Sequence, residues 1–175
     1  MVLLLLPWLN ACTSLSEKKL LTETKPAMGP YETFSGRLIV MEPRRRWQVQ
    51  LQWQAMQANQ GWVRLTHVAS NKVVELRWQD QSMQMRSNSA LSWQETGQKQ
   101  LAEQGIVLAP RQLATLLLGN TPAHFQRKHN TNADTIIWES HGLKPFVRLQ
   151  WQQKSHRLTM TDMTHGRQAI LIIEP

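Results

Sequence analysis

Residues 46–55 read RWQVQLQWQA and alternate between apolar and polar side chains from Trp47 onward. In an extended segment the apolar residues would share one face, and the glutamines would share the other. Alternation with a period of two is typical of a β-strand that has one dry face and one solvated face. Strands of this kind belong mostly to antiparallel sheets, which pack one face on a core.

Similar short β-prone runs occur on both sides of this stretch and are separated by turn-forming residues. They occupy 34–41, 61–66, 73–78, 82–86 and 91–95, and then 135–139, 145–152, 157–162 and 168–173. Two helical patterns interrupt them at 98–104 and 111–118, the second lying between Pro110 and Gly119 as a short helix should. We expect a mainly β fold, a curled antiparallel sheet with a short helical lid over its concave face.

Among the apolar residues tryptophan and methionine are abundant, with eight of each, whereas phenylalanine and tyrosine are scarce. Tryptophan and methionine adapt to irregular apolar partners. Two interpretations stay open: these side chains fill the core of a packed barrel, or they line a partly open hydrophobic cleft. The tryptophans after residue 12 are Trp47, Trp53, Trp62, Trp78, Trp93, Trp138 and Trp151.

Motifs for catalysis or metal binding are missing from the sequence. It contains neither Gly-x-Ser-x-Gly nor His-Glu-x-x-His, and its three aspartates lie in or beside predicted turns. No two histidines stand at metal-ligand spacing on a predicted helix, and His124 and His129 flank one predicted loop. We therefore expect no enzyme, no metal and no cofactor; an envelope hydrolase would need distant residues to converge.

The N-terminus points to export and lipid attachment. Residues 2–11 form an apolar run that is too short to span a bilayer as a helix, which predicts a signal peptide at 1–11. Leu9-Asn10-Ala11-Cys12 resembles the lipobox of bacterial lipoproteins, and Cys12 is the only cysteine, which favours acylation over a disulfide. Thr13 stands where lipoproteins retained in the inner membrane often carry Asp, so the resemblance implies the outer membrane.

The lipobox match has departures that leave two alternatives. No lysine or arginine precedes the apolar run, which a start codon assigned too far downstream would explain. The alternatives are an ordinary signal peptide or a buried N-terminal strand with an unrelated cysteine. We expect a lipidated tether at 12–30, rich in polar residues, and one domain at 31–175.

The net charge of +8 lies entirely beyond residue 12. Its densest cluster is Arg44-Arg45-Arg46 after Pro43, which we interpret as a solvated hairpin tip rather than a dedicated binding site. Arg64, Arg77 and Trp78 interleave charge and aromatic surface as single-stranded nucleic-acid sites do. An exported protein meets anionic lipid first, so we expect no nucleic-acid partner.

Four segments together resemble the LolB family of outer-membrane lipoprotein receptors. They are FSGRL at 34–38, WVRLTH at 62–67, VVEL at 73–76 and GIVLAPRQLATLLLG at 105–119, and the likeness spans about 31–160. The resemblance implies an unclosed antiparallel barrel under a helical lid. It also implies a monomer that accepts acylated lipoprotein cargo from a periplasmic carrier and inserts it into outer-membrane lipid.

A hydrophobic cleft for the cargo's acyl chains would lie between sheet and lid. The residues that we expect to line it are Trp53, Leu65, Leu76, Trp78, Met83, Met85, Leu113, Leu116, Leu117 and Trp151. The family carries an exposed leucine before a glycine in the loop after the third strand, and that leucine is thought to push cargo into the membrane. Here Ala69 takes its place with Val68 beside it, so Val68 and Ala69 are the expected insertion loop.

A second hypothesis, from a different class, is an accessory envelope lipoprotein. Its barrel would pack completely, and its outer surface would bind a protein partner. The two hypotheses differ in whether Trp53, Trp78, Met85 and Trp151 border a void or one another.

Overall fold

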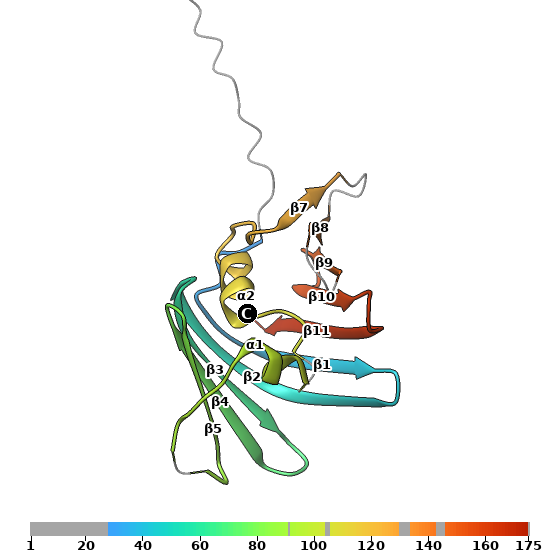
Figure 1. The fold of residues 1–175 in the computed structure, drawn as a ribbon. Helices are drawn as coiled ribbons and strands as arrows, with labels where there is room; N and C mark the ends of the chain where they lie inside the picture. Colours follow the sequence, from blue (N-terminus) through green and yellow to red (C-terminus); the bar gives the residue numbers. More distant parts are fainter. Residues whose placement is uncertain (1–27, 91, 104–105, 130–133, 143–145, 175) are drawn as a thin grey trace, which may run out of the picture.

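The alternating stretch lies within the longest strand of the computed structural model, β2 (Arg45–Gln57). The structure describes residues 28–174 except 91, 104–105, 130–133 and 143–145 (Figure 1). Val49, Leu51, Trp53 and Ala55 are buried, and the intervening glutamines are exposed. The predicted dry and solvated faces of this strand are confirmed.

The described residues form one antiparallel sheet of eleven strands. Its other strands are β1 (Thr33–Glu42), β3 (Gln60–His67), β4 (Lys72–Gln79), β5 (Ser82–Ser87), β6 (Gln94–Glu95), β7 (Phe125–Lys128), β8 (Thr135–Ser140), β9 (Val147–Gln152), β10 (Arg157–Asp162) and β11 (Arg167–Glu174). Their spatial order is β6-β5-β4-β3-β2-β1-β11-β10-β9-β8-β7. The first and last strands therefore pair at the centre and join two meanders.

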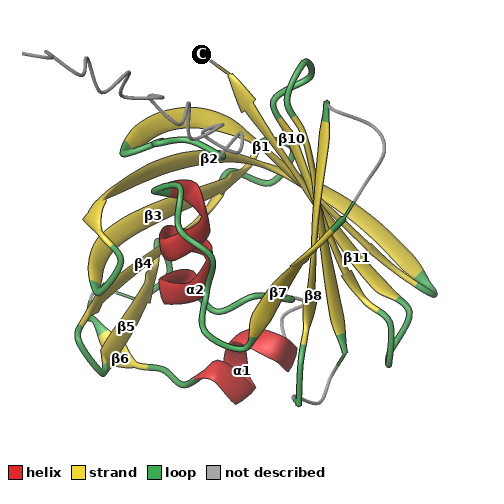
Figure 2. Ribbon diagram, turned by 90° about the horizontal axis from the view of Figure 1, so that it is seen from above, coloured by secondary structure: helices red, strands yellow, loops and turns green. Residues whose placement is uncertain are grey.

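The sheet curls without closing, because β6 and β7 stand at its two edges. Figure 2 shows the strands wrapping around a central space, with a gap between these edges. Two short helices occupy the concave side: α1 (Gln98–Glu103) lies near the gap, and α2 (Pro110–Leu117) lies inside the curve. The predicted fold class, a mainly β unclosed barrel with a helical lid, is confirmed.

Helix α2 begins at the proline expected from the sequence and ends shortly before the expected glycine. Pro110 occupies its first turn, where a missing N–H costs nothing. At its C-terminus the backbone N–H groups of Leu118 and Gly119 donate to Ala114 and Leu116, and Gly119 takes a φ of 87°. Such a left-handed residue ends a helix most cheaply when it is glycine.

One strand is absent from the sequence-based prediction. Residues 125–128 form β7, which pairs with β8, so His124 and His129 flank a strand and not a loop. Phe125 is its only apolar residue, and four residues with one apolar side chain show no period. Met28, expected to belong to the tether, is 1% exposed and packs in the core.

The expected signal peptide, Cys12 and most of the expected tether fall at residues 1–27, which lie outside the described residues. Among the residues that are described, no helix has the length and apolar character needed to cross a membrane.

Candidate functional site

Antiparallel pairing aligns the apolar faces of neighbouring strands on the concave side of the sheet. Leu38 on β1 stands opposite Val49 on one side and Leu171 on the other. Leu51 in turn stands opposite Leu65, and Val63 stands opposite Leu76. These cross-strand rows build a continuous aliphatic surface across the centre of the sheet.

A small apolar cavity of about 60 Å³ lies between this surface and the helical segment. Its roof consists of α2 and of residues 106–108, in the connector between α1 and α2. The lining residues are Leu38, Val40, Leu51, Trp53, Val63, Leu65, Leu76, Ile106, Val107, Leu108, Pro110, Leu113, Met160, Ala169 and Leu171. No charged side chain is among them, so the cavity suits hydrocarbon.

The roof of the cavity is attached at both ends and partly exposed between them. Leu101 and Leu108 are buried, and the Ile106 N–H donates to the Leu101 carbonyl at 3.0 Å. Ile106 and Val107 are half-buried and pack against the core from the connector. A pocket that encloses a drug-sized ligand has about 300–1,000 Å³. Room for a long chain therefore requires the connector to lift.

Trp53 contributes the one polar side-chain atom of the cavity lining. It is 4% exposed, its ring stacks on Phe34 with centroids 6.1 Å apart, and it lies 5.1 Å from the Trp78 ring. Its Nε1 is buried and makes no hydrogen bond within the described residues. A buried unpaired donor costs about 1–3 kcal/mol.

The opposite end of the concave face is filled by aromatic rings. Tyr31 packs edge-on against Trp151, with centroids 5.7 Å apart, and its hydroxyl lies 3.0 Å from His156 Nδ1. Burial raises the pKa of Tyr31 above its ordinary value. The Tyr31 N–H donates to the Leu117 carbonyl at 2.8 Å and ties the start of β1 to the end of α2. We call this region the packed end.

Four of the ten residues expected in the cleft line the cavity. They are Trp53, Leu65, Leu76 and Leu113. The other six lie elsewhere: Leu116 and Leu117 are fully buried on α2, Trp151 belongs to the packed end, Met83 and Met85 lie half-buried on β5, and Trp78 packs over Gly61.

Eleven lining residues were not predicted. Four of them, Leu38, Val40, Ala169 and Leu171, come together because β1 pairs with β11, which alternation within a single strand does not reveal. Their connector members, Ile106, Val107 and Leu108, lie in an irregular segment without a period. The apolar character of 106–108 was the one signal in the sequence for them.

The expected insertion loop is the turn between β3 and β4. Val68 is 62% exposed and Ala69 is also exposed. Ser70 Oγ lies 3.0 Å from His67 Nδ1 at the base of this turn. An apolar side chain therefore projects into solvent at this position, although it is smaller than leucine.

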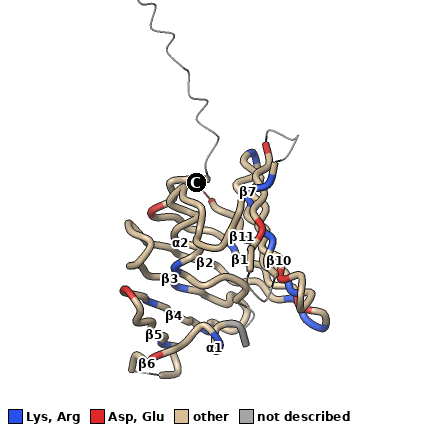
Figure 3. The backbone as a smooth tube through the Cα atoms, turned by 45° about the horizontal axis from the view of Figure 1, so that its top comes forward, with Lys and Arg blue, Asp and Glu red and all other residues tan. Residues whose placement is uncertain are grey.

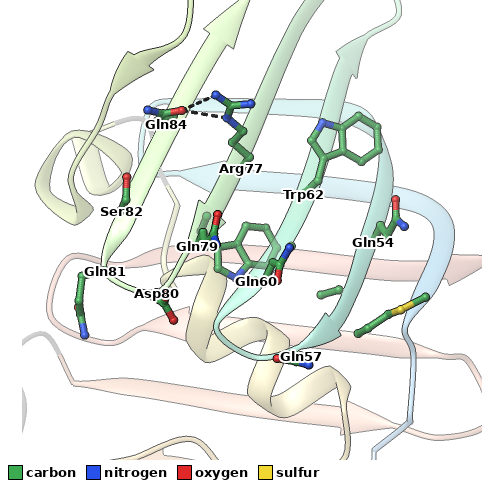
Figure 4. Close-up of a pocket in the computed structure, with 14 residues that line it drawn as sticks. Gln54, Gln57, Gln60, Trp62, Arg77, Gln79, Asp80, Gln81, Ser82 and Gln84 are labelled. Carbon is green, nitrogen blue, oxygen red and sulfur yellow. Dashed lines mark hydrogen bonds between the residues drawn. The ribbon is translucent and has the colours of Figure 1, made fainter.

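A larger hollow, of about 940 Å³, lies at the β2–β5 side of the sheet and is lined by both polar and apolar side chains (Figure 4). Gln54, Trp62, Arg77 and Gln84 face it from four adjacent strands, and Arg77 donates two hydrogen bonds to Gln84 Oε1, at 2.9 and 2.6 Å. Trp78 also lines this hollow, and its Nε1 donates to the Ala58 carbonyl. The amide and guanidinium groups that line this hollow make it unsuitable for an acyl chain.

The three residues that resemble a nucleic-acid site in sequence, Arg64, Arg77 and Trp78, do not share one surface. Arg64 and Arg77 are exposed on the outer face, whereas Trp78 is buried. Arg77 and Arg86 instead stack on Trp93, at 4.2 and 4.7 Å from its ring centroid. In the described part of the chain, no three His, Cys, Asp or Glu residues gather in a metal-binding arrangement.

Comparisons with known proteins find similar solved structures but no match by sequence. No family model matches the chain, and no curated protein matches it. The crystal structure of LolA superfamily protein NE2245 from Nitrosomonas europaea is similar over 85% of this chain and 87% of its own, at 12% identity and a TM-score of 0.48. The crystal structure of MucB in complex with MucA(peri) is similar over 82% of this chain, at 10% identity and a TM-score of 0.34. This chain spans about half of that MucB chain, matching 50% of it.

Proposed function

We propose that this protein is a lipid-anchored outer-membrane receptor that shields the acyl chains of lipoproteins on their way into the membrane. The apolar cavity beneath the α1–α2 connector carries the proposal. Burial of hydrocarbon there contributes about 0.8 kcal/mol per methylene, so a few methylenes give useful affinity. The cargo is handed over by a periplasmic carrier, and acylated Cys12 holds the receptor at the membrane.

The connector acts as the movable part of the site. Ile106 and Val107 close over the cavity when it is empty, which keeps its aliphatic wall out of water. An entering chain displaces them and takes their place against Leu38, Leu65 and Leu113. The acyl chain then covers the aliphatic wall in place of Ile106 and Val107. Opening the connector therefore costs less free energy than exposing the wall to water would.

A binding experiment tests the proposal with a synthetic diacylated lipopeptide as probe. The full chain carrying Cys12→Ser is titrated with the probe in solution, next to the same chain carrying Leu113→Phe. Leu113 lines the cavity, so the larger ring should fill it and weaken binding at least tenfold. Leu118→Phe, the same change on a half-buried residue outside the lining, should bind as the parent does.

The accessory-lipoprotein alternative draws on the small volume of the cavity. At about 60 Å³, with Leu116, Leu117 and Trp151 buried in the core, the barrel is close to filled. Absence of lipopeptide binding by the parent chain, together with destabilisation by Leu113→Phe, would favour this alternative.

Localisation is a separate part of the proposal and has its own test. Cys12→Ser should release the protein from the outer-membrane fraction and abolish labelling by a palmitate analogue. Equal labelling of the parent and of Cys12→Ser would contradict lipid attachment at this residue.

A further inference from the structure

Several turns meet at one end of the half-barrel, which we call the tip end. The β1–β2 turn and the β10–β11 turn are neighbours there, because Met41 pairs with Gln168. The start of β9 joins them, since Val147 pairs with Asp162. The β3–β4 turn opens toward the same end but is set back from these hairpins, since Thr66 near the end of β3 pairs with Gln50, the sixth of the thirteen residues of β2. The packed end lies at the other ends of these strands.

Four arginines gather at the tip end from two separate hairpins. Arg44, Arg45 and Arg46 are exposed around the β1–β2 turn, and Arg167 lies beside the first two. Figure 3 shows this turn as a basic tip that projects from the sheet. Arg45 pairs with Glu42, whereas Arg44 and Arg46 make no ion pair within the described residues. The second carboxylate nearby, Asp162, is buried, binds His165 Nδ1 at 2.7 Å and closes its own turn.

Exposed large apolar side chains concentrate at the same end. The described residues contain four of them, and three are Val68, Phe146 and Met163, at 62%, 38% and 51% exposure. Phe146 and Met163 are adjacent, because the Met163 N–H donates to the Phe146 carbonyl at 2.9 Å. The fourth, Met56, lies near the β2–β3 turn at the opposite end.

We propose that the tip end docks on an anionic lipid bilayer, with Phe146 and Met163 entering the interface and the arginines of the β1–β2 and β10–β11 hairpins binding lipid phosphates. Basic side chains around exposed apolar ones are the combination that interfacial membrane binding requires. The two groups of side chains favour different partners: the arginines favour an anionic partner, whereas Phe146 and Met163 favour an apolar one. A negatively charged bilayer satisfies both.

The inference rests on the proposed function and adds an orientation to it. The cavity residues Val40, Met160 and Ala169 lie toward the tip end of their strands, whereas Trp151 and Tyr31 lie at the packed end. Docking through the tip end therefore brings the cavity, and not the packed end, close to the bilayer. A chain leaving the cavity has the shorter path into lipid on this side.

Vesicle binding tests the electrostatic part. The Cys12→Ser chain should bind vesicles of phosphatidylcholine mixed with phosphatidylglycerol, and bind pure phosphatidylcholine far more weakly. Arg44→Gln with Arg46→Gln should weaken binding about fivefold for each arginine removed, and added salt should erase the difference. Arg64→Gln with Arg111→Gln is the matched control, since both residues are exposed, lie outside the tip end and carry the same charge.

A labelling experiment tests the apolar part. Because Cys12 is the only cysteine, Met163→Cys in the Cys12→Ser chain carries a single environment-sensitive fluorophore. Its emission should shift to the blue on anionic vesicles. Ser155→Cys, exposed in the β9–β10 turn at the opposite end, should show no shift. Equal shifts at both positions, or equal binding by the two arginine double variants, would overturn the proposal.

Lipopeptide binding in solution separates this inference from the proposed function. Both arginine double variants should bind the lipopeptide as the parent does, because these residues do not line the cavity. Vesicle docking without lipopeptide binding would reject the acyl-chain receptor and retain the docking surface. Lipopeptide binding without vesicle docking would retain the acyl-chain receptor and reject the docking surface.

Discussion

The two ends of the concave face use the same strands and differ in how they are filled. At the packed end Tyr31, Phe34, Trp151 and His156 interlock through edge-on ring contacts. Toward the tip end the wall is aliphatic apart from Trp53, and its roof combines α2 with residues 106–109, which have no regular structure. Large rigid rings fill volume completely, whereas leucine and valine under an irregular roof leave a void.

This difference assigns stability and the proposed ligand binding to different parts of one sheet. The packed end also holds α2 in place through the bond from Tyr31 to the Leu117 carbonyl. The cavity is therefore bordered by one rigid support, α2, and by one segment that the packing constrains less. A half-barrel needs both features to remain folded while an apolar ligand enters and leaves.

The largest effect is expected from Trp151→Ala, which tests whether the packed end dominates stability. Trp151 is 1% exposed and contacts both Tyr31 and His156, so the change should lower the free energy of unfolding by about 3–5 kcal/mol. Trp93→Ala is the control, since that ring lies half-buried beneath Arg77 and Arg86 and should cost far less. Urea denaturation followed by circular dichroism measures both. Equal losses would mean that the packed end does not dominate stability.

A second comparison places the same large residue at two positions on α2. Leu117→Trp should overfill the core and cost about 1–3 kcal/mol, because Leu117 has no exposed surface. Leu113→Trp should cost less, because Leu113 borders the cavity and the ring can enter it. Melting temperatures of the two variants decide this. A larger loss for Leu113→Trp would show that the cavity is rigid.

Two tryptophans of equal burial test what a hydrogen bond to the indole N–H contributes to stability. Trp53 and Trp78 are each 4% exposed, but Trp78 donates to the Ala58 carbonyl at 3.1 Å and Trp53 Nε1 has no partner. Trp78→Phe should therefore be more destabilising than Trp53→Phe by about 1 kcal/mol. Chemical denaturation of the pair measures the difference. Equal costs would indicate that the Trp53 donor is satisfied.

The smallest effect concerns the basic turn at the tip end. The hydrogen bond from Arg45, aided by the charges of Arg45 and Arg167 and opposed by burial, lowers the pKa of Glu42. Its contribution to stability is therefore present above the ordinary value of 4.5 and is lost as the pH falls through the lowered one. Glu42→Gln should lower the melting temperature slightly at neutral pH and not in strong acid. A difference that persists in acid would assign the effect to packing.

The curled sheet could be predicted because most strands are short β-prone runs separated by turn-forming residues, and several of them alternate with a period of two. In β2 the alternation of Val49, Leu51 and Trp53 with glutamines predicts both the strand and its buried face. Strand β7 could not be predicted, because Phe125 alone carries no pattern and β8 supplies its pairing.

The candidate site was predictable only in part for a different reason. Parity along a strand assigns Leu65 and Trp151 to the same concave face, but not to a position along the barrel axis. That position depends on where α2 lies, which the contact between Leu117 and Tyr31 determines. Contacts between distant parts of the chain therefore decide which apolar residues meet a void and which meet one another.

The attachment of the chain at Gly29 sets how the domain can stand on a membrane. Gly29 takes a φ of 87°, and a side chain there would collide with the Leu117 carbonyl, so the N-terminal segment enters the fold at the packed end. From Cys12 to Met28 a fully extended chain reaches at most about 55 Å. The longest strand, with 13 residues, spans about 43 Å. The chain from Cys12 to Met28 is thus long enough to run alongside the domain, so the proposed lipid anchor at Cys12 and the proposed docking through the tip end are compatible on one membrane.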